Sequence, residues 1–455
     1  MSGGNLCLRG GDVLTLDGAG SVLRSTDVWI ENGRIAALGG PREGSEGSSR
    51  TGARSVDVSG CLVLPGLVQG HMHLGQTLFR GLAERRRLLA WLRERIWPLE
   101  AAHDDESAYW GAMLGAAECL LGGTTCIQDI GIGPGIRGLL RALADSGLRA
   151  VAGKCLMDAG DALPPNLAEE TERTLIETEE LGLRFDGSAD GRLRYALCPR
   201  FILSGSDALW RGVRELAVRR AWPVHTHALE QRDETEQVRA LKNGRDEIEY
   251  FADAGILATD FRIAHGVWLD ASHFARVRGE RFSVVHCPGS NCKLGSGIAP
   301  VPAIRAAGIP VGLGADGAAC NNDLDALEEV RLAALLQDVT HGPGTLSGLD
   351  ALRLATSEGA QAIGLDGEVG SLEVGKRADI LVLATDRPEM WCAPEVDLHD
   401  LVAFGASRAG VRHVLVDGEL QVEDGHLVNL DLVRLRREAD RVLGDLVRRS
   451  GLDLP

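Results

Sequence analysis

Short apolar runs recur along the middle of the chain and alternate with stretches of helical periodicity. Each run is rich in β-branched and aliphatic residues and ends near Gly, Pro or a polar residue, which is the pattern of a buried strand. The predicted strands are 61–69, 124–130, 148–156, 193–198, 222–227, 261–265, 282–286 and 311–315. Examples of the helices predicted between them are 107–122, 136–147, 206–220 and 234–254.

Alternating strands and helices imply a parallel sheet. Eight repeats without a switch in order favour a closed (β/α)8 barrel over an open, doubly wound sheet. We therefore expect the α/β class, with a (β/α)8 TIM barrel over residues 63–367. In such barrels the chemistry lies at the C-terminal ends of the strands.

The two ends of the chain have a different pattern. Residues 5–60 and 370–428 contain short alternating strands and the tight-turn pairs Asn32-Gly33 and Asp417-Gly418. This predicts a small β-sandwich built from both chain termini, with boundaries at 1–62 and 368–430. A C-terminal segment, 431–455, is predicted to contain an amphipathic helix.

Composition narrows the class of partner. The chain has 455 residues, 44% hydrophobic and 25% charged, which is ordinary for a globular protein. A formal charge of −17 argues against a nucleic-acid partner. No apolar run reaches the length of a membrane span, and no secretion signal is visible at the N-terminus. The ten cysteines form no CxxC pair, so we expect reduced thiols in a cytoplasmic protein.

Polar residues follow several of the predicted strands. His71 and His73 are two positions apart and leave a strand on the same face. His227 and His265 end the fifth and sixth strands, and Asp316 follows the eighth. One such histidine is usually a core residue, but that explanation fits poorly when four strand ends agree. Three imidazoles and a carboxylate suit zinc, with a water completing the site.

Each of these residues has an expected role. A metal ion lowers the pKa of a bound water towards neutrality. Glu230, three residues after His227, is placed to shuttle protons. His265 is expected to orient the hydroxide, and Asp316 to bind metal and accept the water's proton. His225 shares a face with His227 but lies deeper, so we assign it to structure.

A set of motifs runs in order over nearly the whole chain. They are Pro65-Gly66-Leu67, His71-Met72-His73, His227-Ala-Leu-Glu230, Ala264-His265, His286-Cys-Pro-Gly-Ser-Asn291, Leu294-Gly-Ser-Gly-Ile-Ala-Pro300, Gly312-Leu-Gly-Ala-Asp316-Gly317 and Gly370-Ser-Leu-Glu-Val-Gly-Lys-Arg-Ala-Asp379. Together they resemble the amidohydrolase superfamily, in the aminohydrolase branch of S-adenosylhomocysteine/methylthioadenosine deaminases, guanine and 8-oxoguanine deaminases and triazine hydrolases.

The resemblance implies one divalent metal per chain, zinc first and Fe2+ or Mn2+ as alternatives. Its ligands would be His71, His73, His227 and Asp316. Binuclear relatives use a carboxylated lysine at the end of the fourth strand.

Here the fourth strand ends in Arg200, and Lys154 belongs to the third. We therefore expect a single metal. We expect Lys154 to contact substrate or a carboxylate such as Asp158.

The reaction implied is hydrolytic deamination of an amino-substituted N-heterocycle. Metal-bound hydroxide attacks the ring carbon that carries the amino group. Glu230 protonates the adjacent ring nitrogen, Asp316 relays a second proton, and ammonia leaves.

Two groups of residues resemble different substrate specificities. Trp91 and Glu100 resemble adenosine-analogue deaminases, in which the tryptophan lines the pocket and the glutamate holds ribose hydroxyls. Gln76, Arg200 and Phe201 resemble guanine-type deaminases, in which Gln and Arg bind the polar edge of the purine and Phe packs on its face.

The longer of the two matches favours a 5′-modified adenosine of the S-adenosylhomocysteine, methylthioadenosine or 5′-deoxyadenosine type. Guanine or 8-oxoguanine comes second, and triazine aminohydrolysis or chlorohydrolysis third. Two other readings stay open: a metal-free scaffold, and a hydantoinase-like hydrolase with two metals. We expect a purine-like small-molecule substrate, no nucleic acid, no membrane, and a homo-oligomer, either dimer or tetramer.

Overall fold

Two units make up the structure, a computed structural model that describes residues 5–40, 53–160 and 163–453. The first unit spans 1–69, 118–126 and 325–430, and the second spans 70–117, 127–324 and 431–455. Parts of the predicted terminal segments, at 1–4, 41–52 and 454–455, lie outside the described residues.

Strands from both ends of the chain share one sheet in the first unit. Its order is β19-β18-β17-β16-β5-β1-β2-β3, and β4 pairs with β1. The strands are β1 (Leu6–Leu14), β2 (Val22–Glu31), β3 (Arg34–Leu38), β4 (Arg54–Asp57), β5 (Cys61–Pro65), β16 (Ile380–Ala384), β17 (Val411–Val416), β18 (Glu419–Glu423) and β19 (His426–Leu427). The joining of both termini in one sheet agrees with the expected terminal β unit, while its two-layer arrangement stays a prediction.

Local sequence explains the hairpins of this sheet. Asn32 and Gly33 have φ of 51° and 74°, and Asp417 and Gly418 have φ of 50° and 74°. Positive φ at both central residues is the type I′ geometry that matches the twist of a hairpin. Both predicted turns are thereby confirmed, the first between β2 and β3 and the second between β17 and β18.

The remaining elements of the first unit are helical. They are α12 (Ala326–His341), α13 (Gly348–Leu354), α14 (Ser357–Ala362), α15 (Leu398–Gly405), η4 (Pro388–Met390) and η5 (Arg408–Gly410). Within this group α13 packs against both α12 and α15.

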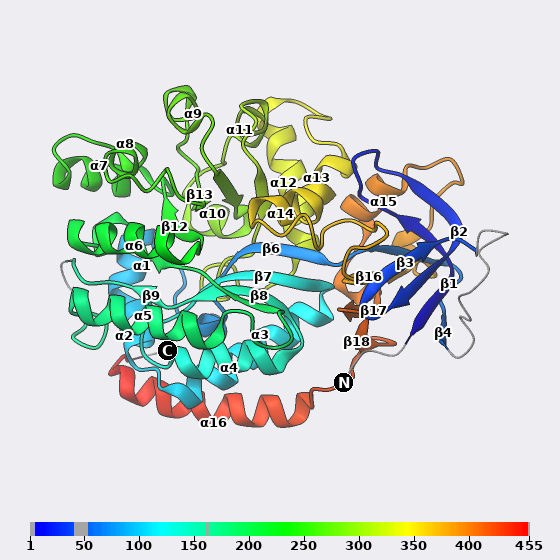
Figure 1. Ribbon diagram of the computed structural model, residues 1–455, viewed down its shortest axis with the longest axis horizontal. Coiled ribbons are helices and arrows are strands. Elements are labelled where there is room, and N and C mark those ends of the chain that lie inside the picture. Colours follow the sequence, from blue (N-terminus) through cyan, green and yellow to red (C-terminus); the bar gives the residue numbers. More distant parts are fainter. Residues whose placement is uncertain (1–4, 41–52, 161–162, 454–455) are drawn as a thin grey trace. The chain divides into compact units, whose positions relative to one another are not determined.

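Parallel strands form the centre of the second unit (Figure 1). One sheet has the order β10-β8-β7-β6, another has the order β12-β13-β14-β15, and β11 pairs with β9. The strands are β6 (Leu67–Met72), β7 (Thr124–Ile130), β8 (Arg149–Gly153), β9 (Cys155–Leu156), β10 (Leu193–Tyr195), β11 (Cys198–Pro199), β12 (Val224–Ala228), β13 (Phe261–His265), β14 (Phe282–His286) and β15 (Val311–Leu313).

Two isolated parallel bridges join the edges of these sheets. Leu197, between β10 and β11, pairs with Val224 of β12, and Met72 of β6 pairs with Asp316 after β15. Each strand is buried along almost its whole length, which is why the sequence shows continuous apolar runs rather than alternation. The predicted α/β class is confirmed.

Helices connect the successive strands of the second unit (Figure 1). They are η1 (Leu74–Phe79), α1 (Leu88–Trp91), η2 (Leu92–Ile96), α2 (Trp97–Ala101), α3 (Asp105–Leu121), α4 (Ile136–Ser146), α5 (Thr171–Phe185), η3 (Ile202–Ser204), α6 (Asp207–Arg220), α7 (Arg232–Leu241), α8 (Glu247–Asp253), α9 (Ala271–Val277), α10 (Pro288–Leu294), α11 (Val301–Ala306) and the C-terminal α16 (Leu432–Ser450). None of the helices in the described part of the chain combines the length and hydropathy that a membrane crossing requires.

Several predicted elements are divided in the structure. The run 61–69 is two strands, because the chain turns at Gly66 from the sheet of the first unit into β6. A Cβ on Gly66 would lie 2.2 Å from the Thr125 side chain, so only glycine fits this approach. The single helix predicted at 234–254 is α7 and α8, separated where Asn243 and Gly244 have φ of 56° and 85°.

A buried histidine anchors η1 and makes stability depend on pH. His103 Nε2 donates to the Gly75 carbonyl at 3.0 Å, and Nδ1 lies 3.0 Å from the Ser107 hydroxyl. Burial lowers the pKa of His103 to about 4 from an ordinary 6.5. The unfolded chain therefore binds a proton that the folded chain does not, between about pH 6.5 and pH 4, and stability falls as the pH falls through that window.

We expect the substitution His103→Gln to remove this contribution to the pH dependence of stability. Between pH 7.5 and pH 5.0 the wild type should lose about 2 kcal/mol more unfolding free energy than the variant. Urea denaturation at the two pH values measures the difference. The matched control His426→Gln replaces an exposed histidine and should keep the wild-type dependence. Equal losses in all three proteins would show that His103 does not contribute.

Candidate functional site

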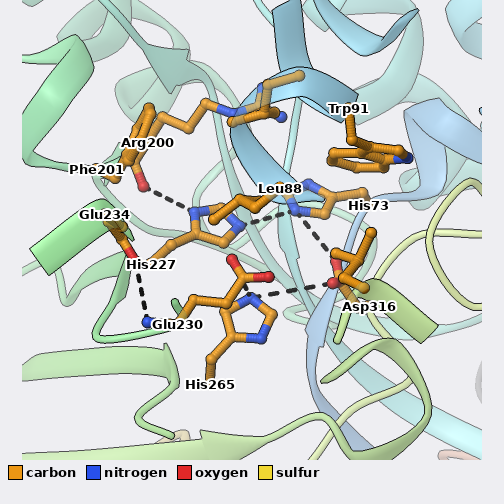
Figure 2. A pocket seen from close by; sticks show the side chains of 12 residues that line it. His73, Leu88, Trp91, Arg200, Phe201, His227, Glu230, Glu234, His265 and Asp316 are labelled. Carbon is orange, nitrogen blue, oxygen red and sulfur yellow. Dashed lines mark hydrogen bonds and ion pairs between the residues drawn. The ribbon is translucent and has the colours of Figure 1, made fainter. Parts of the chain in front are cut away.

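The residues expected at the strand ends gather in one place in the second unit (Figure 2). Nitrogen atoms of His71, His227 and His265 lie within 4.8 Å of one another, as do ligand atoms of His71, His73 and Asp316. All are at or just after the C-terminal ends of β6, β12, β13 and β15. Parallel strands end on the same side of a sheet, which is why distant sequence positions meet here.

Two imidazoles in this cluster each point the lone pair of a ring nitrogen at the other. His73 Nε2 lies 3.0 Å from His227 Nε2. His73 Nδ1 is 2.8 Å from the Ile130 carbonyl, and His227 Nδ1 is 2.7 Å from the carbonyl of Arg200. A carbonyl only accepts, so each Nδ1 carries the proton and each Nε2 is a bare acceptor. Two such acceptors in close contact call for a cation between them.

Further acceptors point to the same place. Asp316 Oδ1 is 3.4 Å from Nε2 of both His71 and His73. His71 Nδ1 is 2.9 Å from His225 Nε2, so His225, assigned to structure from the sequence, holds the ring of His71. With Nδ1 held in this way, the other ring nitrogen of His71, Nε2, faces Asp316.

Electrostatics agrees with a cation site. Burial lowers the pKa of His73 to about 3 and that of His227 well below its ordinary value. Burial would raise the pKa of Asp316, but the hydrogen bond with His71 and the surrounding imidazoles outweigh it and hold that pKa well below its usual range. At neutral pH the rings are therefore neutral and the carboxylate is ionised. This donor set fits a divalent metal such as zinc.

A carboxylic acid lies beside the cluster. Glu230 is 3% exposed, and burial together with the charge of Asp316 raises its pKa well above the ordinary value. Its Oε2 is 3.4 Å from His265 Nε2, and its Oε1 accepts from the Ser296 hydroxyl at 3.4 Å. The raised pKa favours the acid form of Glu230, which is the form that can donate a proton.

Helix α10 holds two groups of the cluster. The Ser290 hydroxyl donates to Asp316 Oδ2 at 2.7 Å, and Asn291 Oδ1 lies 2.9 Å from His265 Nδ1. His265 and Asp316 both have left-handed φ, at 72° and 64°, a conformation that costs energy and that these bonds help to retain. The sequence motif contains Ser290 and Asn291, but their contacts could not be assigned from it.

A cavity lined by both polar and apolar side chains opens onto the cluster. Trp91, Arg200 and Phe201, expected to bind substrate, line it. Figure 2 shows these side chains around the imidazoles. The whole lining is His73, Leu88, Trp91, Leu92, Arg200, Phe201, His227, Glu230, Glu234, His265, Leu294 and Asp316.

Two of the expected substrate contacts, Gln76 and Glu100, do not line this cavity. Both are buried, and they contact Arg200 or each other. Arg200 Nη1 donates to Glu100 Oε2 at 2.6 Å, and Gln76 Nε2 donates to Glu100 Oε1 at 2.9 Å.

Lys154 lies outside the cavity lining and contacts carboxylates, which is one of the two roles expected for it. Its amine donates to Glu177 at 2.6 Å and to Thr174 at 3.1 Å, and it also pairs with Glu169. The side chain is 1% exposed and absent from the cavity lining. Because a buried ammonium needs anionic partners, it has turned towards the carboxylates around α5. We assign it no substrate contact, and the expected partner Asp158 binds Thr171 and Ser206 instead.

Comparisons with known proteins give the family of this chain. The model of the family described as "Amidohydrolase family" matches residues 62–420. The chain is 35% identical to a protein named 5-methylthioadenosine/S-adenosylhomocysteine deaminase from Pelotomaculum thermopropionicum, over 98% of this chain and 100% of the relative. It is 34% identical to a protein named 5′-deoxyadenosine deaminase from Methanobrevibacter smithii, over 93% of this chain and 94% of the relative.

A solved structure is similar along the whole length. It is described as an adenosine deaminase from Xanthomonas campestris with bound zinc, and it has a TM-score of 0.88 and 30% sequence identity to this chain. The superposition covers 98% of this chain and 99% of the other.

Proposed function

Because the chain belongs to the amidohydrolase family, we propose that it is a metal-dependent hydrolytic deaminase of a 5′-modified adenosine. Substrates of the S-adenosylhomocysteine, methylthioadenosine or 5′-deoxyadenosine type would release ammonia. The observation that carries the proposal is the cluster of facing imidazole lone pairs beside the buried carboxyl group of Glu230, whose pKa burial raises. The names of the full-length relatives support this substrate class.

We assign the metal to four residues: His71, His73, His227 and Asp316. The convergence of unprotonated nitrogens with one ionised carboxylate supports this set, and zinc is the first choice of ion. When bound, a divalent cation would acidify water in the cavity. The gathering of these donor atoms in one place supports a single metal per chain.

The protein's own groups supply the proton transfers. Glu230 in its acid form donates a proton to the ring nitrogen beside the carbon that bears the amino group. Asp316 accepts a proton from the attacking water and passes it to the departing amine. His265, held by Asn291, orients the water through its Nε2, while Trp91 lines the cavity.

A second proposal concerns the architecture of the chain. We propose that the parallel strands close into a (β/α)8 barrel over 63–367, and the bridges Leu197–Val224 and Met72–Asp316 at both sheet edges support closure. The ends 1–62 and 368–430 would form the β-sandwich, followed by the C-terminal segment 431–455.

Ammonia release across a substrate panel tests the proposed function. Zinc-loaded protein should act on methylthioadenosine, S-adenosylhomocysteine or 5′-deoxyadenosine with a kcat/KM at least about 100-fold above that for guanine, 8-oxoguanine and a triazine. The highest value with guanine or 8-oxoguanine would contradict the proposed substrate class. No ammonia from any compound, with little zinc bound, would favour the metal-free scaffold.

A further inference from the structure

The two oxygens of the Glu230 carboxyl group have different surroundings. Glu230 lines the cavity, and its Oε2 lies 3.4 Å from Nε2 of His265, another lining residue. Its Oε1 lies 3.4 Å from the hydroxyl of Ser296, which is absent from the lining. Figure 2 shows the Glu230 side chain among the imidazoles of the cluster. One oxygen therefore faces the cavity side, and the other faces the interior of the protein.

The Gln231 side chain orients the Ser296 hydroxyl. Gln231 Nε2 lies 3.0 Å from the Leu294 carbonyl and 3.2 Å from Ser296 Oγ. A carbonyl only accepts, so the group that faces it is the amide NH2, and Ser296 Oγ accepts from the same NH2. Ser296 and Gln231 are both buried, so these bonds are made within the protein.

The Ser296 hydroxyl has one proton, and Glu230 receives it. With its oxygen accepting from Gln231, Ser296 points its O–H at Glu230 Oε1, the one acceptor that it meets in the part of the chain that the structure describes. Donation in the opposite direction would leave a buried hydroxyl proton without an acceptor, which is costly. Burial raises the pKa of Glu230, and the hydrogen bond from Ser296 opposes that rise because a donor stabilises the carboxylate.

We propose that Ser296 is a positioning residue that, together with Gln231, places the acid proton of Glu230 on Oε2. This rests on the proposed function and deepens it. With Oε1 held as an acceptor, the proton of the carboxylic acid is bonded to the oxygen on the cavity side. On donation, the O–H bond at Oε2 breaks, an N–H bond forms on the ring nitrogen, and the bonding electron pair stays on the carboxylate. The Ser296 donor then stabilises that carboxylate through Oε1.

The C=O stretch of the Glu230 carboxylic acid reports on Oε1 directly. Infrared spectroscopy identifies it as the acid band that the zinc-loaded protein has and Glu230→Gln lacks. Ser296→Ala removes the donor to the C=O oxygen, so the band should move to higher wavenumber. If Oε1 carried the proton instead, the C=O oxygen would be Oε2 and the band should stay in place. An unmoved band would therefore overturn the inference.

Turnover of the best substrate in the panel gives a second measurement. Ser296→Ala should lower kcat about 10- to 100-fold, the value of a hydrogen bond to a charged group. KM should change less than about threefold, because Ser296 is outside the cavity lining. In the Glu230→Gln background the same substitution should change kcat less than about threefold, since no acid proton is left to place.

A merely structural role gives a different pattern. It would lower kcat equally in both backgrounds, and that result would overturn the inference. Where the residual turnover of Glu230→Gln falls below detection, the infrared result decides. Ser296→Thr keeps a hydroxyl and should restore both the band position and kcat. A loss in Ser296→Thr as large as that in Ser296→Ala, with the band at its wild-type position, would assign the effect to packing and equally overturn it.

A buried serine elsewhere serves as the matched control. Ser146 and Ser296 are each 3% exposed, but the Ser146 hydroxyl donates to the Leu143 carbonyl at 2.9 Å within α4. Ser146→Ala should leave the band and kcat unchanged. If Ser296→Ala does not fold, Ser296→Cys takes its place, and its weak thiol donor should shift the band in the same direction.

Failure of the proposed function is recognised separately. It appears as the absence of ammonia from every compound in the panel, while the infrared band still reports on Oε1. If the Glu230 acid band is missing at every pH at which the protein is folded, the inference is overturned together with the acid role of Glu230. Zinc content and Tm, recorded for every variant, separate these outcomes from loss of metal or of the fold.

Discussion

Replacing Glu230 by glutamine is expected to lower kcat for ammonia release by about 10³-fold, a typical contribution of a positioned acid or base. Glutamine has the same shape but cannot carry the proton that the ring nitrogen needs. The side chain keeps its neighbours His265 and Ser296, so the cavity should persist. Metal analysis of the same preparation should show unchanged zinc.

The pH profile gives this prediction a second measurement. Burial raises the pKa of Glu230 well above its ordinary value, and the acid form is the one that donates. Wild-type turnover should therefore decline as the pH rises through that pKa, and Glu230→Gln should lack this limb. The control is Glu236→Gln, an exposed residue of α7, which should behave as wild type. More than a tenth of wild-type turnover in Glu230→Gln would refute the shuttle role.

Removal of metal by a chelator is expected to abolish turnover, and zinc should restore it. Without a cation, the lone pairs of His73 and His227 face each other at 3.0 Å, so the folded state should also lose stability. Free zinc at 1,000 times its dissociation constant adds about 4 kcal/mol to the free energy of unfolding. Thermal unfolding with and without zinc measures this, and activity assays follow the recovery.

Substitution of one proposed metal ligand tests whether zinc acts at this cluster. His73→Gln should bind little zinc and show no zinc-dependent rise in Tm, whereas the exposed control His426→Gln should keep both. Zinc content near one per chain is expected. Full activity after chelation would remove the basis of the proposed mechanism, and two metals per chain would favour the hydantoinase-like alternative.

Much of the site could be predicted because it depends on strand geometry. His71 and His73 are two positions apart, and the period of a strand places them on one face. His227, His265 and Asp316 come at or just after strand ends, and parallel strands bring such ends together. The convergence seen among these five residues follows from those two regularities, although the assignment of the metal to them stays a proposal.

Other features depended on partners far away in the chain. Apolar runs could not reveal the division at Gly66, because β5 and β6 are both fully buried and differ only in which sheet they join. Lys154 ends a strand and could have faced the cavity, yet its amine lies among the carboxylates around α5. Its direction depends on which anions the fold brings close.

The sequence alone determined the order of strands and helices, the hairpin turns and the residue types at the strand ends, since these follow from local periodicity and backbone preference. Only the tertiary structure decided which buried charges are paired. Glu100 and Arg200 are 100 positions apart and 2.6 Å from each other. A buried ion without a partner is strongly destabilising, so the fold brings the two charges together. No local sequence pattern indicates which distant residue will be the partner.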